Sequence, residues 1–376
     1  MRSSPLDIAL LAPLVSPIRQ PYVGGAQALL RDLAVGLAQR GRRVTLYAAT
    51  GSDPAALPGV TLVNVPVDAT RVRPTNFSEA TTTAGDAPID PAVEAAFASA
   101  FALIASQAPR HDIIHAHAYD APAFRRAQAL GLPVVHTLHL PALDPSINAL
   151  LAELAPAHTA RVAGQPWLAT VSNACAATYT CRIDEVIYNG IDVDAIPFGA
   201  TADSVDSLLF AGRITPEKGV EDAIAIALAA KMHLTLVGGV YDQRYFSTRI
   251  QPLLAAHADA LTYLGPQPRE RVWNLMAQAS AVVIPSLWDE PFGLVACEAH
   301  AAGAPIVGYD SGGLREIVVQ GETGILVSRG SRDQAAQALA DVIHFNRRAC
   351  RTRVETQFSL DATITAYEAL YLRMYA

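Results

Sequence analysis

The chain has 376 residues, of which 51% are hydrophobic and 17% are charged, and its formal net charge is −7. A composition this apolar can bury sizeable cores, which excludes a disordered chain. The 28 Lys and Arg residues are outnumbered by 35 Asp and Glu residues, so no basic surplus supports a dedicated nucleic-acid binder. The length predicts about two domains.

The four cysteines form neither a CxxC pair nor a zinc spacing with histidine; they are Cys175, Cys181, Cys297 and Cys350. We therefore expect reduced thiols and a cytoplasmic protein. The N-terminal segment contains proline and aspartate and lacks a convincing cleavage site, so no signal peptide is expected. No stretch approaches about 18 uninterrupted apolar residues, so no transmembrane helix is expected.

Short apolar runs recur along the chain, each followed by a longer segment with helical periodicity. Many runs are apolar throughout, which is typical of parallel strands buried on both faces. In the first half the predicted strands are Asp7–Ala12, Val44–Ala48, Val60–Val65, Asp112–His115, Val134–His136, Leu168–Ser172 and Val186–Tyr188. In the second half they are Leu208–Ala211, Leu234–Val237, Leu261–Leu264, Val282–Pro285, Ile306–Tyr309 and Ile325–Val327. The alternation predicts an α/β fold with parallel sheets.

The strand–helix alternation pauses twice. Residues 71–90 are rich in Thr, Pro and Ala and predict a surface loop, whereas residues 193–206 lack periodicity and indicate a linker. We therefore predict an N-terminal domain at 1–193, a linker at 194–206, a C-terminal domain at 207–355 and a last helix at 356–376 that could cross back to the first domain. Ligands usually bind in the cleft between two such domains.

The best-known phosphate and hydrolase motifs are absent: no GxGxxG follows the first strand, and no GxxxxGK[ST], GxSxG or HExxH occurs. Gly24 and Gly25 open the helix predicted at 26–40. Adjacent glycines let backbone N–H groups approach a ligand closely at the positive end of a helix. The alternative is a turn that needs a positive φ.

Two cations follow the first strand of the second half. Arg213 and Lys218 stand five residues apart at a strand–helix junction. Arginine offers planar bidentate contacts and lysine a point charge, so the pair could clamp a diphosphate. The alternative is ordinary solvated surface charge.

Two carboxylates flank the start of a later helix. Glu290 lies in the loop after a predicted strand, Phe292, Gly293 and Leu294 mark the helix start, and Glu298 lies within the helix. The N–H groups at a helix start point outwards. Eight residues of helix span roughly 12 Å. One carboxylate could accept hydroxyl groups from a sugar and the other from a ribose, without a metal. Two carboxylates on a capped surface helix are the weaker alternative, because the apolar neighbours indicate burial.

These segments together resemble glycosyltransferase family 4, the retaining family with the GT-B fold. The most specific match is Glu-x7-Glu, present as Glu290-PFGLVAC-Glu298; GGAQALLRDLAVGLAQRGRRV, DIIHAH, VSN, IYNGID and FAGRITPEKG precede it in the expected order. The resemblance covers nearly the whole chain. It implies two Rossmann-like, doubly wound parallel-sheet domains that face each other across a cleft.

The resemblance also implies roles for the matching residues. Gly24 and Gly25 would lie beside the donor phosphates or sugar, and Arg213 and Lys218 would neutralise the diphosphate. Glu290 would orient the donor sugar, with the N–H groups of Phe292, Gly293 and Leu294 near the sugar and phosphate, and Glu298 would hold the ribose hydroxyls. His139 would lie beside the transferred sugar. His136, the competing candidate, falls inside a strand and fits a satisfied core histidine better.

His115 and His117 lie at a predicted strand end, where packing and an acceptor-side role are equally good interpretations. Asp192-Val193-Asp194 forms a DxD but lies in the family-like NGID segment, so we interpret it as structural and expect no metal and no cofactor. A cluster of four arginines near the first helix, Arg31, Arg40, Arg42 and Arg43, leaves peripheral membrane contact open.

The expected reaction moves a hexose-type sugar from a nucleotide donor to an acceptor hydroxyl with retention of configuration. A UDP-sugar is favoured and a GDP-sugar comes next, on family frequency. The acceptor could be a glycan, a lipid-linked group or a small molecule. An epimerase or phosphorylase of the same fold, or a non-catalytic nucleotide-sugar binding module, are the alternatives.

Overall fold

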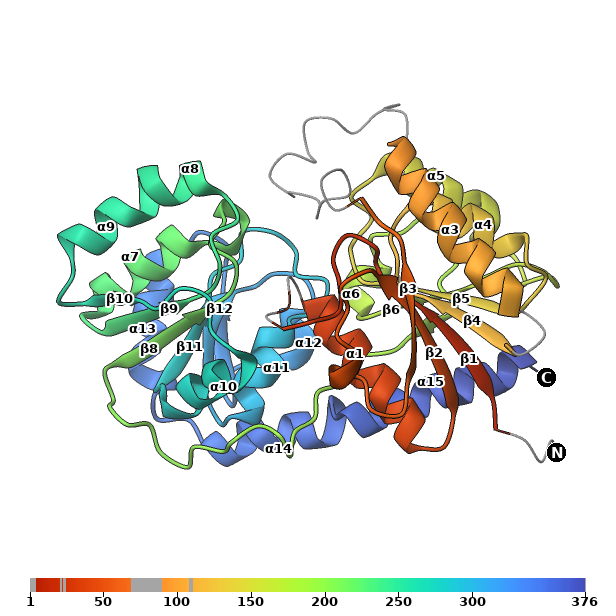
Figure 1. Cartoon of the computed structure of the whole chain (residues 1–376). Helices are drawn as coiled ribbons and strands as arrows, with labels where there is room; N and C mark the ends of the chain where they lie inside the picture. Colours follow the sequence, from red (N-terminus) through yellow and green to blue (C-terminus); the bar gives the residue numbers. More distant parts are fainter. Residues whose placement is uncertain (1–4, 21, 23–24, 69–89, 108–110, 376) are drawn as a thin grey trace. The chain divides into compact units, whose positions relative to one another are not determined.

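The computed structural model describes residues 5–20, 22, 25–68, 90–107 and 111–375 (Figure 1). The chain divides into two compact units. Unit 1 comprises Met1–Gly190 together with Leu360–Ala376, and unit 2 comprises Ile191–Ser359. Except for its last residue, the surface loop predicted at 71–90 lies outside the described residues.

Unit 1 is built on a seven-stranded parallel sheet with the strand order β3-β2-β1-β4-β5-β6-β7. The strands are β1 (Asp7–Leu11), β2 (Arg43–Ala49), β3 (Thr61–Val65), β4 (Ile113–Ala116), β5 (Val134–Leu138), β6 (Trp167–Thr170) and β7 (Glu185–Val186). The residues of β1, β4 and β5 are all buried, as their unbroken apolar character predicts.

Helices cover both faces of this sheet. They are α1 (Gly25–Gln39), α3 (Pro91–Gln107), α4 (Ala121–Gln128), α5 (Pro145–Leu154), α6 (Asn173–Ala176) and α15 (Leu360–Tyr375). The core beside α1 and α15 contains Leu33, Ile364 and Tyr367, and the separate core beside α3 and α4 contains Phe97. A Cβ on Gly36 would lie 2.2 Å from Ile364 Cδ1, so α15 packs directly against α1 (Figure 1).

Unit 2 repeats this architecture with a six-stranded parallel sheet ordered β10-β9-β8-β11-β12-β13. The strands are β8 (Ser207–Ala211), β9 (His233–Val237), β10 (Leu261–Tyr263), β11 (Ala281–Ile284), β12 (Ile306–Tyr309) and β13 (Gly324–Val327). The helices are α7 (Val220–Ala230), α8 (Gln243–Tyr245), α9 (Gln251–Ala256), α10 (Arg269–Gln278), α11 (Leu294–Ala301), α12 (Leu314–Ile317), α13 (Arg332–Val342) and α14 (Arg347–Gln357), with the short segments η3 (Pro216–Lys218) and η4 (Phe246–Ile250).

Each strand in both sheets overlaps a run predicted from the sequence, and the predicted α/β class with two doubly wound parallel sheets is confirmed. In unit 1 the strand order reverses between β1 and β4, and in unit 2 between β8 and β11. The carboxyl ends of strands at such a reversal are where doubly wound sheets bind ligands. Among the described helices, none is long and apolar enough to cross a membrane.

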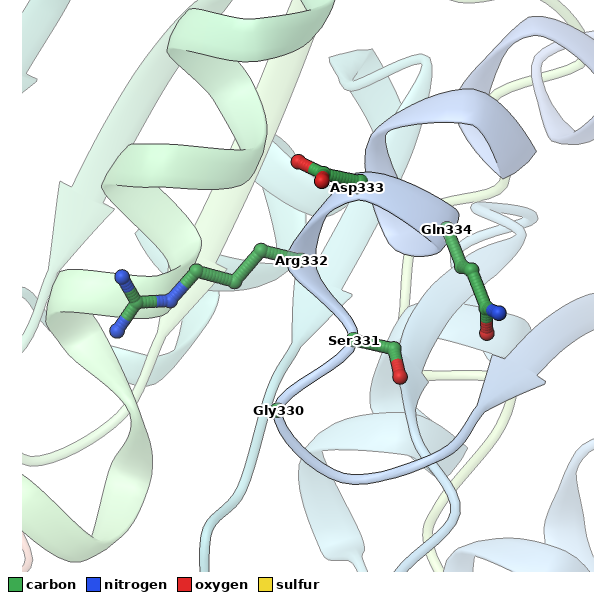
Figure 2. Close-up of a pocket in the computed structure, with 5 residues that line it drawn as sticks. All are labelled: Gly330, Ser331, Arg332, Asp333 and Gln334. Carbon is green, nitrogen blue, oxygen red and sulfur yellow. The ribbon is translucent and has the colours of Figure 1, made fainter.

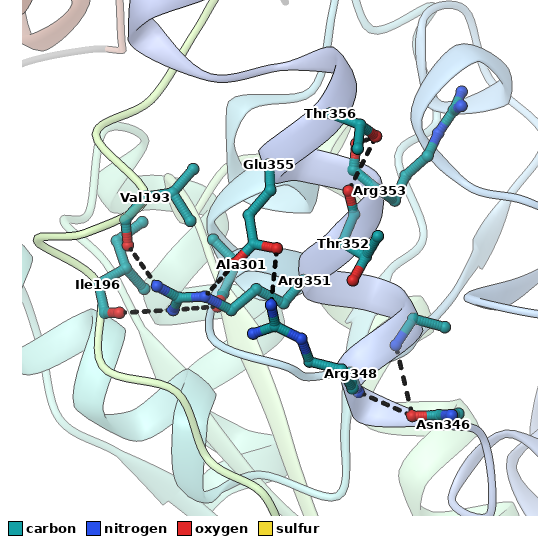
Figure 3. A network of polar contacts seen from close by, with 11 residues as sticks. Val193, Ile196, Ala301, Asn346, Arg348, Arg351, Thr352, Arg353, Glu355 and Thr356 are labelled. Carbon is teal, nitrogen blue, oxygen red and sulfur yellow. Dashed lines mark hydrogen bonds and ion pairs between the residues drawn. The ribbon is translucent and has the colours of Figure 1, made fainter.

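The segment predicted as a linker, 194–206, lies within unit 2. Arg351 of α14 donates hydrogen bonds to the carbonyl oxygens of Ile196 (2.8 Å) and Val193 (3.0 Å), as Figure 3 shows. Arg347 donates to the carbonyl oxygen of Gly199 (2.6 Å). Two arginines therefore fasten the start of this segment to the last helix of unit 2.

Candidate active site

Two loops meet at the reversal point of the unit 2 sheet. The loop after β8 carries Arg213 and Lys218, and the loop after β11 carries Glu290. The Lys218 Nζ atom lies 2.6 Å from Glu290 Oε1, although 72 residues separate them in sequence. The fold therefore brings together a predicted diphosphate ligand and the predicted sugar ligand.

The Glu290 side chain is buried, and two donors hold the same oxygen. Ser286 Oγ donates to Glu290 Oε1 alongside the Lys218 ammonium group. Burial would raise the pKa of Glu290, but the charge of Lys218 and these hydrogen bonds outweigh it and hold the pKa below its ordinary value. Glu290 is therefore a buried anion, and its remaining lone pairs can accept hydroxyl groups. Sequence reasoning missed Ser286, four residues upstream, because no motif marks it.

The backbone around Glu290 leaves no space for larger residues. Gly219 has a φ of +69°, and a Cβ there would lie 1.9 Å from the carbonyl oxygen of Pro285. Gly312 has a φ of +51°, and its Cβ would lie 2.2 Å from the carbonyl oxygen of Glu290. The Gly313 N–H also donates to that oxygen at 2.7 Å. Close packing of three loops therefore fixes the position of Glu290.

Arg213 has a carboxylate partner of its own. Its Nη2 lies 3.2 Å from Glu217 Oε1, which also accepts a hydrogen bond from Thr215 Oγ1 at 2.7 Å. Sequence reasoning missed Glu217, although it stands directly before Lys218. Each predicted diphosphate cation is thus paired with one carboxylate, and the four side chains together have no net charge.

The other residues predicted around this helix occupy its first turns. Phe292 is buried, Gly293 precedes the helix with a φ of +114°, and Leu294 is the first residue of α11. Because Gly293 has no side chain, it cannot cap the helix start as Ser or Asp would. No side chain at the capping position therefore occupies the first N–H groups of α11.

Glu298 lies one turn into α11 and contacts α10. Its Oε1 accepts hydrogen bonds from Arg269 Nε (3.1 Å) and Trp273 Nε1 (3.0 Å). The Arg269 guanidinium group lies over the Trp273 ring, 4.6 Å from its centroid. Glu298 therefore belongs to a second polar group in unit 2, separate from the Lys218–Glu290 pair, and neither Arg269 nor Trp273 was predicted.

In unit 1, His139 directly follows β5, and its Nε2 lies 2.8 Å from Nδ1 of His117, which follows β4. Burial lowers the pKa of His139 to about 4, so the ring is neutral at physiological pH. Gly25 is the first residue of α1 and is exposed, whereas Gly24 lies outside the described residues.

The two other histidines of this region differ from each other. His115 has partners on both ring nitrogens, Tyr371 Oη at 2.6 Å and Thr137 Oγ1 at 2.7 Å. His136 is fully buried in β5, but neither of its ring nitrogens has a hydrogen-bond partner among the residues that the structure describes. The interpretation of His136 as a satisfied core histidine is therefore correct in its burial and wrong in its hydrogen bonding. Burial lowers its pKa to about 3.

The DxD segment serves a turn in this structure, because Asp192 Oδ1 accepts a hydrogen bond from the Ala195 N–H at 3.4 Å. In the part of the chain that the structure describes, no group of three His, Cys, Asp or Glu side chains is placed to hold a metal.

A shallow hollow at the start of α13 is lined by Gly330, Ser331, Arg332, Asp333 and Gln334 (Figure 2). The Arg332 side chain forms an ion pair with Asp222 of α7. Because five consecutive residues make the whole lining, the hollow contains none of the predicted site residues.

Two family models match successive parts of the chain: Glycosyltransferase Family 4 over residues 23–195 and Glycosyl transferases group 1 over residues 198–356. A glycogen synthase from Mycobacterium tuberculosis is 33% identical over 302 residues, which cover 70% of this chain and 69% of the relative. A D-inositol 3-phosphate glycosyltransferase from Pseudarthrobacter chlorophenolicus is 28% identical, with 85% of this chain and 83% of the relative covered.

Solved structures share the architecture. HepE from Anabaena, in complex with UDP, matches with a TM-score of 0.73 at 19% identity, covering 98% of this chain and 100% of that chain. The sucrose-phosphate synthase of Thermosynechococcus elongatus matches with a TM-score of 0.76 at 21% identity, covering 98% and 99%. The predicted GT-B fold is thereby confirmed.

The fold and the curated relatives define the chain as an enzyme of the glycosyltransferase class. Within that class, the chain belongs to glycosyltransferase family 4.

Proposed function

We propose that this chain is a retaining glycosyltransferase that transfers a hexose-type sugar from a UDP-linked donor to an acceptor hydroxyl without a divalent metal. A GDP-linked donor is the second choice. The contact between Lys218 and Glu290 at the reversal point of the unit 2 sheet gives this proposal its main support, because it joins a cation suited to a phosphate with a carboxylate suited to sugar hydroxyls.

The leaving diphosphate gains negative charge as the bond to the sugar breaks. Lys218 has three N–H donors, and its contact with Glu290 uses one of them. Lys218 and Arg213 can therefore turn donors towards the phosphates while their carboxylate partners hold them in place. Donors fixed before the reaction stabilise developing charge without reorganisation. In this scheme the two side chains do the work that a divalent ion does in other transferases.

The sugar and the ribose would be held by carboxylates. Glu290 would orient the sugar, with the backbone N–H groups of Phe292, Gly293 and Leu294 nearby. Glu298 would accept the ribose hydroxyls, because Arg269 and Trp273 keep its carboxylate fixed on α11. The remaining expected contacts come from unit 1, namely Gly24, Gly25 and His139.

The choice of donor and acceptor draws on the relatives. HepE has been solved with UDP and with UDP-glucose, which supports a uridine donor. The names of the curated relatives point to two acceptor types, a glucan for glycogen synthase and an inositol phosphate for the inositol transferases. We therefore favour a soluble, hydroxyl-rich acceptor over a lipid-linked one.

The arginine cluster gives little support to membrane contact. Arg40 and Arg42 pair with Glu368 of α15, and Arg31 pairs with Asp32. Arg43 likewise pairs with Asp7 (2.9 Å). Cations that are already paired within unit 1 contribute less to binding an anionic surface. All four cysteines are free thiols, which fits a reaction in the cytoplasm.

A thermal-shift titration tests the donor site. The protein would be titrated with UDP, GDP and ADP in EDTA, and then with UDP-glucose and the GDP-sugars. A ligand that binds only the folded state raises stability by RT ln(1 + [L]/Kd), so we expect UDP to give the largest shift. A shift that requires Mg²⁺ would contradict the metal-free mechanism, and no shift with any nucleotide would contradict the donor site.

Two arginine variants make a matched pair for the same titration. Arg213 and Arg249 each pair with a glutamate in unit 2, at 3.2 Å and 2.7 Å, but Arg249 lies on the surface of η4. Arg213→Ala should reduce the UDP-induced shift, and Arg249→Ala should leave it unchanged. Equal effects would mean that Arg213 is ordinary surface charge.

A further inference from the structure

The ends of β4 and β5 hold two imidazole rings that meet edge to edge. The His117 Nδ1 and His139 Nε2 atoms are 2.8 Å apart, the ring centroids are 5.1 Å apart, and the ring planes differ by 21°. Since the bonded nitrogens are much closer than the centroids, both nitrogens lie between the two ring centres. The rings are therefore nearly coplanar and share one well-aligned hydrogen bond.

Only one of the two rings can donate this hydrogen bond when both are neutral. Burial lowers the pKa of both rings, to about 4 for His139 and well below the ordinary value for His117, so both are neutral. A neutral imidazole carries one N–H and one bare nitrogen. The direction of the hydrogen bond therefore decides which nitrogen of His139 carries its proton.

The second ring nitrogen of His117, Nε2, indicates which ring donates the hydrogen bond between His117 and His139. His117 Nε2 is buried and has no hydrogen-bond partner within the described part of the chain. If His139 were the donor, this nitrogen would carry an N–H buried without an acceptor, which is rare and costly. If His117 is the donor, the same position holds only a bare nitrogen. The ring of His115 packs beside His117 with centroids 4.0 Å apart, and its own nitrogens are engaged with Tyr371 and Thr137.

We propose that His117 is a positioning residue that donates its Nδ1–H to Nε2 of His139 and so fixes His139 as the Nδ1–H tautomer. His139 then presents a hydrogen-bond donor at Nδ1, the nitrogen that no protein group occupies among the described contacts. This rests on the proposed function, in which His139 lies beside the transferred sugar. There the Nδ1–H would donate to an oxygen of the sugar, and His139 would not act as a base.

Nuclear magnetic resonance reads the tautomer without any activity measurement. The probe is protein labelled with ¹⁵N in its histidine rings, with the His139 signals assigned by their loss in His139→Gln. We expect the Nδ1 signal of His139 to have the shift of a protonated nitrogen and Nε2 that of a bare one. A protonated Nε2 would overturn the proposal.

Three variants separate positioning from packing. His117→Leu removes the donor, and we expect His139 to lose its single-tautomer signature. His117→Asn can place an amide N–H near the same point and should restore the Nδ1–H form. His136→Leu is the matched control, because His136 is equally buried but its ring nitrogens have no hydrogen-bond partner among the described residues. Unchanged His139 shifts in a folded His117→Leu protein would overturn the proposal.

The rate of UDP release from UDP-glucose gives a second readout. Losing a donor aimed at the sugar should lower kcat about tenfold in His117→Leu, with the KM for UDP-glucose changed less than about twofold. His117→Asn should recover most of the rate, and a fall in His136→Leu as large as in His117→Leu would contradict a positioning role. If UDP fails to bind the wild-type protein, the proposed function fails, whereas the tautomer of His139 is still decided by its spectrum.

Discussion

Both units place polar residues at the carboxyl ends of central strands, but the two groups differ in charge. In unit 2, the loops after β8 and β11 hold cations paired with carboxylates, as in the Lys218–Glu290 contact. In unit 1, the loops after β4 and β5 hold His117 and His139, which burial keeps neutral. Topology therefore decides where a site forms, and the local balance of burial and charge decides what it can bind.

This contrast fits the proposed transfer reaction. A diphosphate needs fixed cations, and buried ion pairs provide them without a net charge when the ligand is absent. A sugar is uncharged and needs directional hydrogen bonds, which neutral imidazoles and carboxylates provide. Four changes test whether the two units differ in this way.

Acid has the largest expected effect and should act on unit 1 first. Burial lowers the pKa of His136 to about 3 and of His139 to about 4, and it lowers the pKa of His115 and His117 as well. Between pH 6.5 and 4 these histidines are protonated in the unfolded chain but remain neutral in the folded chain. Stability is therefore present above pH 6.5 and falls on acidification by about 1.4 kcal/mol per pH unit for each such histidine.

Segment-resolved hydrogen exchange, corrected for the intrinsic rate, checks this order. In unit 2, burial lowers the pKa of one comparable histidine, His300, to about 4. We expect the unit 1 sheet to lose protection first, and His136→Leu should flatten its pH dependence by about one proton. Earlier loss of protection in unit 2 would contradict the comparison.

Removing the cation from the buried pair comes next. Lys218→Met leaves the Glu290 carboxylate buried without a counter-charge, which should cost about 3 kcal/mol at pH 7. In the wild type the pKa of Glu290 is lowered, so its contribution is present above the ordinary pKa and is lost as the pH falls. In the variant burial raises that pKa, so stability should instead decline as the pH rises.

Urea unfolding at pH 5 and pH 7 measures this reversal. The double variant Lys218→Met with Glu290→Leu removes both charges and should recover most of the lost stability. If Lys218→Met alone is as stable as the double variant at pH 7, then an unpaired Glu290 carboxylate is not costly, and the Lys218–Glu290 pair is not shielded from water.

Arg213→Ala should affect turnover far more than stability. Its guanidinium group forms a partly exposed ion pair with Glu217, so the free energy of unfolding should change by less than about 1 kcal/mol. The loss of one preorganised donor to the leaving group should lower kcat about 100-fold. Both kcat and the free energy of unfolding would be measured for Arg213→Ala and for Arg249→Ala. A large loss of kcat in Arg213→Ala alone indicates a diphosphate ligand, whereas equal effects in both variants indicate surface charge.

Glu298→Gln should have the smallest effect. The amide keeps the size of the side chain but weakens hydrogen bonds to hydroxyl groups, so UDP affinity should fall about tenfold in isothermal titration calorimetry. Glu221→Gln, which disturbs only the exposed pair with Arg249, is the control. If Glu298→Gln binds UDP with unchanged affinity, Glu298 does not contact the nucleotide.

The order of strands could be anticipated from the sequence because buried parallel strands are apolar throughout. Asp7–Ala12 and Val134–His136 show this pattern, and the structure places β1 and β5 there. Three candidate donor-binding residues could be named from the sequence because Arg213, Glu290 and Glu298 combine charge with strand ends and helix starts. Local pattern alone therefore predicted the sheets and named several candidate site residues.

Contacts between distant segments could not be predicted in this way. The Lys218–Glu290 contact joins the loops after β8 and β11 across 72 residues. Ser286 and Glu217 lie only four residues from Glu290 and Arg213, but no motif marks them. The segment at 194–206 has no periodicity, and its start is held by hydrogen bonds from Arg347 and Arg351. Arg351 lies 158 residues beyond Val193, a separation that no local pattern spans.

The position of α15 in the chain has a consequence for synthesis. This helix supplies Ile364, Tyr367 and Leu370 to a core of unit 1, yet all of unit 2 is translated before it. During synthesis, α15 therefore cannot cover the apolar face of the unit 1 sheet until the whole of unit 2 has left the ribosome. Contacts spanning such long sequence separations form slowly, so unit 2 should complete first and unit 1 should depend on chaperones for longest.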